Sequence, residues 1–358
     1  MKRTVTVLVT GGGASGIAGT LYALRNNPDG VQVRVITCDM RDDVIGKYLA
    51  DRFYTVPPAE NSDFIDTLLE IAVQEEVDVI LPQVTQELLP LAENLSRFEK
   101  EDIAVAIASK EAIKCANDKW EILQAAEKCG VPTPQSRLTH SEEELKQTVK
   151  DFGYPEKKVV VKPRVSSGLR GLRILSEELW DVTRFLKEKP SSLEIRLDEL
   201  LAILRGDQWP ELIVQEFLPG KEYTIDVFRG CHGAVAVPRL REEIRSGITF
   251  RAKVELRDDL QRYALKLAEE LDLRYAFGFQ FKLSDTGVPK LLECNPRVQG
   301  TMVTAMFAGC NVIWWAVKEA LGEEVVPESP KQRVNGMRFI RYWGGVAVYG
   351  DGKTFGPI

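Results

Sequence analysis

The sequence predicts a protein of mixed class, in which an α/β domain with a parallel sheet precedes an α+β region with antiparallel strands. The first third of the 358 residues alternates short apolar runs with helical patterns, which is typical of a parallel sheet covered by helices on both faces. From about residue 133 the pattern changes to hairpin-like strands mixed with helices. We expect three parts, at residues 1–112, 113–217 and 218–358.

The elements of the first part follow from composition and periodicity. Runs rich in Val and Ile predict buried strands at residues 4–10, 33–38, 77–82 and 103–108. Helical patterns occupy residues 16–26, 63–74, 87–98 and 112–129. The Gly and Pro residues of the segment 130–134 end the last of these helices.

Strands and helices of the second half are shorter and less regular. Strands are expected at residues 158–163, 212–217, 223–228, 278–283 and 290–294, the last two as a hairpin. Helices are expected at residues 177–188 and 258–271. Residues 191–210 are interpreted as a surface insertion with one short helix.

Composition argues against several classes of function. A net charge of −6 disfavours nucleic acid or an anionic membrane as the main partner. No apolar run approaches the roughly 20 residues that a membrane span needs, and the N-terminal run predicts a strand rather than a signal peptide. A cytoplasmic protein is expected, with its six scattered cysteines reduced and buried. Two histidines, His140 and His232, leave little basis for a zinc site or a Ser-His-Asp triad.

A glycine-rich turn follows the first expected strand. Gly11, Gly13 and Gly16 match the spacing G-x-G-x-x-G, and Asp39 ends the second strand. This pattern is the fingerprint of a dinucleotide site, so by itself it favours an NAD-dependent oxidoreductase. However, a doubly wound sheet also needs a tight glycine turn after its first strand. The rest of the chain describes a different nucleotide site, and NAD binding is therefore the rival hypothesis.

A lysine and a small-residue loop predict phosphate contacts. Lys162 ends an apolar strand and precedes a proline, a position where packing gives no reason for a cation. Its compact charge can reach a phosphate. Ser166, Ser167 and Gly168 follow, and the backbone amides of such a loop can fold over phosphate oxygens.

A second strand and its turn predict contacts to a nucleoside. Glu216, Phe217 and Leu218 end an apolar strand, where they offer backbone groups to an adenine edge and an apolar wall to its face. Glu222, just past the turn, can accept hydrogen bonds from ribose hydroxyls. An ordinary hairpin is the alternative interpretation.

The expected hairpin at residues 278–294 predicts a magnesium site. Gln280, Glu293 and Asn295 can share one face, because residues two apart on a strand point to the same side. Three oxygen-bearing side chains suit Mg²⁺, which takes its other ligands from phosphates and water. Arg297 follows and can direct a forked cation toward an anion beyond the metal.

In this order the segments resemble the ATP-grasp superfamily, and most of all the synthetase halves of the carbamoyl phosphate synthetase large subunit. The resemblance extends to about residue 321. It implies an ATP-grasp fold with an N-terminal Rossmann-like (pre-ATP-grasp) parallel-sheet domain, then a small lobe with a linker helix and a large C-terminal lobe. It also implies ATP held between the two lobes, Mg²⁺ as the metal with Mn²⁺ as an alternative, and phosphoryl transfer to a carboxylate.

The resemblance also implies roles for individual residues. Lys119 and Lys162 would hold phosphates, and residues 216–218 would line the adenine. Glu222 would hold the ribose, and the metal would be carried by Gln280, Glu293 and Asn295. Arg239, Arg241 and Arg245 would lie near the transferring phosphate and the acyl acceptor; a solvated charged face is the alternative. Arg245 and Arg297 are the expected catalytic residues.

These observations predict an ATP- and Mg²⁺-dependent carboxylate–amine ligase that works through an acyl phosphate, with a thiol as a variant nucleophile. The chain shows one ATP-grasp unit where the synthetase has two, so phosphorylation of bicarbonate or carbamate is an alternative. Two further alternatives are an NAD-dependent oxidoreductase and a catalytically silent nucleotide-binding module. Expected partners are small carboxylates and amines, with no nucleic acid or membrane, and a homodimer is an open alternative.

Overall fold

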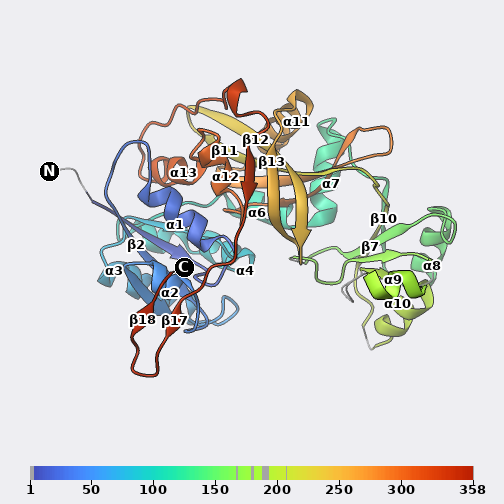
Figure 1. Ribbon diagram of the computed structural model, residues 1–358, viewed down its shortest axis with the longest axis horizontal. Helices are drawn as coiled ribbons and strands as arrows, with labels where there is room; N and C mark the ends of the chain where they lie inside the picture. Colours follow the sequence, from blue (N-terminus) through green and yellow to red (C-terminus); the bar gives the residue numbers. More distant parts are fainter. Residues whose placement is uncertain (1–3, 167, 179–180, 188–192, 207, 358) are drawn as a thin grey trace. The chain divides into compact units, whose positions relative to one another are not determined.

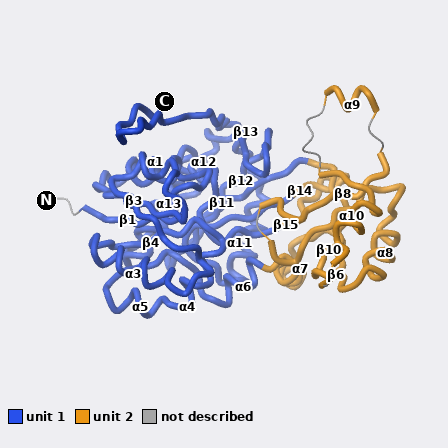
Figure 2. Tube along the Cα trace, turned by 90° about the horizontal axis from the view of Figure 1, so that it is seen from below, with its two compact units in different colours: residues 1–117, 221–281, 293–358 blue, residues 118–220, 282–292 orange. Residues whose placement is uncertain are grey.

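The computed structural model describes residues 4–357 except 167, 179–180, 188–192 and 207 (Figure 1). The chain divides into two compact units (Figure 2). Unit 1 comprises Met1–Asn117, Lys221–Phe281 and Glu293–Ile358, and unit 2 comprises Asp118–Gly220 and Lys282–Leu292. Most residues of the first and third expected parts lie in unit 1, and most of the second part in unit 2. The three-part division itself stays a prediction.

Unit 1 begins with the parallel sheet that the sequence predicts. Its strands run in the order β3-β2-β1-β4-β5. They are β1 (Val5–Thr10), β2 (Val33–Asp39), β3 (Arg52–Thr55), β4 (Val79–Leu81) and β5 (Ala104–Val105). All six residues of β1 are buried, as expected for a central strand covered on both faces. The sequence analysis missed β3 because this edge strand is short, partly exposed and has no apolar run.

The helices of this region are α1 (Ile17–Arg25), α2 (Gly46–Leu49), α3 (Phe64–Gln74), α4 (Thr85–Glu93), α5 (Leu95–Glu99) and α6 (Lys110–Asn117). Two expected helices are each divided. The segment 87–98 forms α4 and α5, which meet at Asn94. The segment 112–129 forms α6 and then α7 (Lys119–Lys128), because Asp118 has an extended backbone and caps α7.

The glycine-rich turn after β1 serves close packing within unit 1. Gly11 has a φ of +66°, a conformation that favours glycine. A Cβ on Gly16 would lie 2.6 Å from the Cα of Gly300. Asp39 accepts a hydrogen bond from the Gly13 amide at 2.7 Å, so this carboxylate has a partner in the protein itself. These contacts support the packing interpretation of the glycines.

The second sheet of unit 1 has the strand order β15-β14-β11-β12-β13-β16. Its strands are β11 (Glu222–Gly230), β12 (Gly233–Arg245), β13 (Ile248–Val254), β14 (Tyr275–Leu283), β15 (Pro289–Asn295) and β16 (Arg338–Ile340), and residues 282–292 of the β14–β15 hairpin belong to unit 2. Helix α11 (Asp258–Glu270) covers one face, where Tyr263 stacks on Phe281. The other face packs in part on α13 (Val312–Ala320), where Phe228 contacts Trp315.

Unit 2 is built on a five-stranded sheet in the order β6-β10-β7-β8-β9. The strands are β6 (Ser136–Thr139), β7 (Val159–Pro163), β8 (Arg173–Leu175), β9 (Glu194–Ile195) and β10 (Leu212–Glu216), and α7 is joined by α8 (Glu142–Asp151), α9 (Val182–Lys187) and α10 (Leu197–Leu204). The core includes Val159, Val161 and Val214. Of the expected helix 177–188, only Val182–Lys187 is helical among the described residues, and residues 177, 178 and 181 are not; the expected insertion contains β9 and α10.

The remaining described elements are α12 (Val303–Phe307), a 3₁₀ turn at Gln332–Val334, and the hairpin of β17 (Ala347–Val348) and β18 (Thr354–Phe355). All six cysteines are free. Cys231 is exposed and Cys115 is half-buried, which corrects the expectation that all six are buried. Across the described residues, no helix combines the length and the apolar character needed to cross a membrane.

Candidate active site

Unit 2 holds the two lysines assigned to phosphates. Lys162 lies in β7 and Lys119 begins α7, and their exposed fractions are only 4% and 6%. The Lys162 ammonium donates to the carbonyl of Leu292 at 3.1 Å. The Lys119 ammonium donates to the carbonyl and, at 3.1 Å, to the hydroxyl of Ser166. The structure thus brings Lys119 and the small-residue loop together.

The loop itself is described only in part. Gly168 has a φ of +64°, so its backbone adopts the left-handed conformation that glycine allows at little cost. Ser167, also assigned to phosphate binding, lies outside the described residues. A Cβ on Gly171 would lie 2.5 Å from Cγ of Pro163, so the loop returns close to the strand that carries Lys162.

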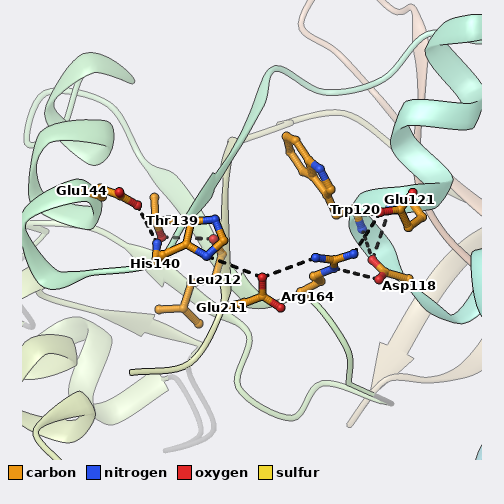
Figure 3. Close-up of polar contacts among 9 residues, drawn as sticks. All are labelled: Asp118, Trp120, Glu121, Thr139, His140, Glu144, Arg164, Glu211 and Leu212. Atoms are coloured by element: carbon orange, nitrogen blue, oxygen red, sulfur yellow. Dashed lines mark hydrogen bonds and ion pairs between the residues drawn. The ribbon is translucent and has the colours of Figure 1, made fainter. Parts of the chain in front are cut away.

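An ion-pair network that the sequence analysis did not identify joins Arg164 to the start of α7 and to Glu211 (Figure 3). The Arg164 guanidinium contacts Asp118 at 2.7 Å, Glu121 at 2.9 Å and Glu211 at 3.3 Å. The Lys119 amide also donates to the Arg164 carbonyl at 3.1 Å. Because Asp118 caps α7 and Arg164 follows Lys162-Pro163, the network joins the two lysine-bearing elements. Asp118 directly precedes Lys119 and Arg164 lies two residues after Lys162, and this proximity is the one signal that the sequence offers.

Arg164→Met should therefore lower the free energy of unfolding by about 1–2 kcal/mol, since a charge-assisted hydrogen bond is lost at a partly exposed site. Chemical denaturation followed by fluorescence would measure the loss. Arg137→Met is the matched control, because Arg137 pairs with Asp151 where both side chains are well exposed. Equal losses in the two variants would show that the Arg164 network contributes no more than a surface ion pair.

The residues assigned to adenine lie at the end of β10. Glu216 accepts a hydrogen bond from the Gln135 amide at 2.8 Å and pairs with Lys290. The Lys282 ammonium lies 5.3 Å from the centroid of the Phe217 ring, and Leu218 is buried. The Glu216 carboxylate is thus occupied by protein groups, which leaves backbone atoms and apolar side chains for a base.

Glu222, assigned to ribose, begins β11 in unit 1. Its carboxylate forms an ion pair with Arg241, whose guanidinium also donates to Gln280 at 3.3 Å. Burial lowers the pKa of Arg241, an effect that the charge of Glu222 opposes. Neutralisation of Arg241 is therefore a role of Glu222 that the sequence analysis did not foresee.

The residues assigned to the metal lie on β14 and β15. Glu293 and Asn295 are two apart on β15 and so point to the same side, and Gln280 lies on the neighbouring strand. The Glu293 side chain is half-buried and makes no hydrogen bond or ion pair with any residue that the structure describes. One unpaired carboxylate and two amide oxygens fit a hard cation that takes its other ligands from phosphates and water.

This donor set differs from an all-acidic metal centre. Among the described residues, no group of three or more His, Cys, Asp or Glu could hold a metal ion. A site with one formal anion suits Mg²⁺, which is commonly bound by one or two carboxylates together with substrate phosphates. The assigned residues therefore fit ATP-bound Mg²⁺ better than a metal held by protein ligands alone.

The two arginines assigned to catalysis have different surroundings. Arg297 donates to Asn295 at 3.2 Å and to Thr85 at 2.9 Å, and burial lowers its pKa. Arg245 instead lies at the exposed turn between β12 and β13, where it pairs with Glu243 and lies 4.5 Å from the centre of the Phe250 ring. The structure thus brings Arg297, but not Arg245, into hydrogen-bonding contact with an assigned metal ligand.

Glu87 is a buried acid that the sequence analysis did not single out. It lies in the first turn of α4 and accepts a hydrogen bond from the Thr10 hydroxyl. Burial raises its pKa from 4.5 to about 7, an effect that Asp39 strengthens and Arg297 weakens. Thr10 ends β1, where the strand order reverses between β2 and β4, and ligands of open α/β sheets bind at such points. Sequence alone does not distinguish a buried Glu in the first turn of a helix from a solvent-exposed one.

Stability should depend on pH through Glu87. In the folded state the Glu87 carboxyl stays protonated up to about pH 7, whereas in the unfolded chain it ionises near pH 4.5. The free energy of unfolding should therefore fall as the pH rises between these two values, because the charged carboxylate is costly to bury. Glu87→Gln removes the ionisation and should be more stable than the wild type above pH 7, by up to about 3 kcal/mol. Below pH 4.5 the two should differ little. Denaturant unfolding in both pH ranges checks this, and a difference independent of pH would contradict it.

The two units carry a fold that known proteins share. Residues 208–340 match the family described as ATP-grasp in the biosynthetic pathway with Ter operon, and residues 7–106 match the PylC-like N-terminal domain. The biotin carboxylase domain of 2-oxoglutarate carboxylase from Hydrogenobacter thermophilus, solved with MgADP and bicarbonate, aligns with a TM-score of 0.67 at 18% identity, covering 89% of this chain and 70% of that one. The ADP complex of N5-carboxyaminoimidazole synthetase from Staphylococcus aureus aligns with a TM-score of 0.65 at 16% identity, covering 92% of this chain and 80% of that one.

The chain is thus an ATP-grasp protein in fold, with a Rossmann-like N-terminal domain, and the resemblance that its sequence predicts is confirmed. Its sequence is 24% identical over 355 residues to the carbamoyl phosphate synthase large chain of Xylella fastidiosa strain 9a5c, covering 90% of this chain and 31% of that protein. The large chain of Vibrio cholerae is 25% identical over 313 residues, covering 83% and 27%. The chain spans less than a third of the length of these relatives. These matches agree with the prediction of an ATP-grasp enzyme of the ligase type.

Proposed function

We propose that this protein is an ATP- and Mg²⁺-dependent ligase that activates a carboxylate as an acyl phosphate and transfers it to an amine. The observation that carries the proposal is the half-buried carboxylate of Glu293, which has no hydrogen bond or ion pair with a described residue, points to the same side of β15 as Asn295 and lies on the strand next to that of Gln280. Bound Mg²⁺ would neutralise phosphate charge there. Lys119 and Lys162 would bind the phosphates, and residues 216–218 would contact the adenine.

The chemistry requires positioning and charge neutralisation. An oxygen of the substrate carboxylate forms a bond to the γ-phosphorus of ATP while the bond from that phosphorus to the β–γ bridging oxygen breaks, which releases ADP. The amine then forms a bond to the acyl carbon, phosphate leaves, and the nitrogen loses a proton. Arg297, which is held by Asn295 and Thr85, would stabilise the charge on the transferred group.

A screen for ADP release against pools of carboxylates and amines tests the proposal. Hydroxylamine should intercept the acyl phosphate and give a hydroxamate in the presence of the correct carboxylate. ADP release that depends on no carboxylate would contradict the ligase assignment. ATP with Mg²⁺ should also raise the melting temperature, and NADH should not; the reverse result would favour the NAD-dependent alternative.

Bicarbonate is the second candidate carboxylate. The curated relatives that match over most of this chain are named carbamoyl phosphate synthase large chain, which favours this alternative. Bicarbonate-dependent ADP release without hydroxamate formation from any organic acid would select it. An amine as the nucleophile and a homodimeric assembly stay predictions of the sequence.

A further inference from the structure

The first turn of α4 contacts the arginine that the proposed function assigns to the transferred group. Helix α4 begins at Thr85, whose hydroxyl accepts a hydrogen bond from Nε of Arg297 at 2.9 Å. The other two nitrogens of the guanidinium donate to the Val298 carbonyl at 3.0 Å and to Asn295 at 3.2 Å. These two partners are neighbours of Arg297 in the chain, whereas Thr85 lies 212 positions away. The Thr85 hydroxyl therefore fixes the guanidinium relative to the parallel sheet.

Glu87 lies in the same turn of α4 and is only 6% exposed. Its carboxylate accepts hydrogen bonds from the Thr10 hydroxyl and from the backbone of Val84, the residue that precedes the helix. The second bond is the one that an acid or amide at the third helical position makes in a capping box. Arg297 acts on this carboxyl through its charge, and the charge of Glu87 acts on Arg297 in return. The first turn of α4 thus carries both a hydrogen-bonding partner and a charge partner of Arg297.

The charge on Glu87 changes near neutral pH. Burial raises the pKa of its carboxyl to about 7, against the hydrogen bond from Thr10. Among the neighbouring charges, that of Asp39 on β2 adds to the rise and that of Arg297 opposes it. Cys38 on β2 also faces Glu87, but burial raises the pKa of this thiol well above its ordinary value, so the thiol stays neutral in this range.

Helix α6 packs on α4, and its charged side chains act elsewhere. Lys110 pairs with Glu93 at the other end of α4, and Lys114 acts on the same carboxylate. Glu111 is exposed. The ionisation of Glu87 is therefore set by its burial, its hydrogen bonds and the charges of β2 and Arg297.

These contacts give Arg297 a fixed position and a charge that its neighbour can offset. An arginine that stabilises a transferred phosphoryl group acts through a preorganised position and an unbalanced charge. A protonated Glu87 leaves the guanidinium charge unbalanced, whereas an ionised Glu87 offsets part of it. We propose that the first turn of α4 regulates the site, with Thr85 as a positioning residue for Arg297 and the proton on Glu87 as the switch that keeps the guanidinium active. The inference rests on the proposed function for the group that Arg297 binds.

Thr85→Val tests the positioning role, because it removes the hydroxyl and keeps the shape of the side chain. ADP release with the carboxylate found by the screen should show a kcat lower by about tenfold to a hundredfold, since a small misplacement of a catalytic group has effects of this size. KM for ATP should be unchanged. Thr85→Ser keeps the hydroxyl and should keep the wild-type kcat. Equal losses in the two variants, or a rise in KM with kcat unchanged, would overturn the positioning role.

Glu87→Gln tests the switch, because glutamine also suits the capping position and cannot ionise. The wild-type kcat should fall about tenfold relative to that of Glu87→Gln as the pH rises from about 6 to 8, the range in which Glu87 ionises. The ratio of the two rates is the readout, since the amine ionises alike in both reactions. Glu93→Gln is the matched control, because Glu93 ends the same helix, is exposed and pairs with Lys110, so its profile should match the wild type. A ratio that does not change with pH would overturn the switch.

The coupling of Glu87 to Arg297 also has a readout that needs no activity. Because Arg297 lowers the pKa of Glu87, NMR titration of the labelled Glu87 carboxyl should give a higher pKa in Arg297→Met than in the wild type. Arg297→Lys keeps the charge and should leave the wild-type value. Identical titration in Arg297→Met and the wild type would refute the inference. Absence of carboxylate-dependent ADP release in the wild type would instead refute the proposed function, and the titration would still decide the coupling.

Discussion

Glu293→Gln is expected to lower ATP-dependent turnover by at least about a hundredfold, because it removes the one formal anion of the assigned metal set. Changes to groups that merely hold a metal ligand in place lower metal affinity or activity about 10–100-fold, and loss of the ligand's own charge should lower them at least as much. The carboxylate has no hydrogen bond or ion pair with a described residue that could be lost, so the fold should persist. Its charge, however, opposes the burial that lowers the pKa of Arg241 and of Arg297, so the free energy of unfolding should be equal to or slightly below that of the wild type.

The measurement is ADP release over a series of Mg²⁺ concentrations, together with denaturant unfolding of the same sample. Part of the lost rate should return at high Mg²⁺, because a weakened metal site fills again by mass action. Glu324→Gln is the control, since Glu324 is strongly exposed and lies outside the assigned site. A Glu293→Gln enzyme with the wild-type rate and Mg²⁺ dependence would refute the metal assignment.

The sequence predicted the fold well where hydrophobic patterns were long or buried. The apolar runs of β1, β2 and β10 and the strong helical period of α11 appear within one or two residues of the expected bounds. The exposed edge strand β3 was missed because strand pairing, and not an apolar run, creates it. The single helix expected at 112–129 is divided because the Asp118 side chain caps α7, a local hydrogen bond that outweighs helical propensity.

The site could be predicted only as far as sequence motifs reach. Motif spacing placed Glu293 and Asn295 on one face because the period of a strand is fixed. The partners of charged groups come from distant segments, and no spacing rule gives them. The pairing of Glu222 with Arg241 and the bond between Glu87 and Thr10 join residues 19 and 77 positions apart.

Lys162→Met should weaken ATP binding by about 1.5–3 kcal/mol, because methionine keeps the aliphatic stem and removes one charge-assisted contact to phosphate. This loss corresponds to a rise of about tenfold to a hundredfold in the dissociation constant. Calorimetric titration with ATP and Mg²⁺ would measure it. Lys157→Met is the control in the same unit, since Lys157 is exposed and should leave the affinity unchanged.

The same titrations separate the ATP-grasp assignment from the NAD-dependent alternative. That alternative places the nucleotide at the glycine-rich turn of unit 1, so Lys162→Met should have no effect under it, whereas Gly13→Val should abolish NADH binding. Under the ATP-grasp assignment Gly13→Val acts through packing, since a Cβ there would lie 2.9 Å from a Val44 methyl group. ATP affinity should then persist in the folded fraction of Gly13→Val and fall in Lys162→Met. Unchanged ATP affinity in Lys162→Met would refute the assignment of this lysine to phosphate and, with it, the ATP site proposed for unit 2.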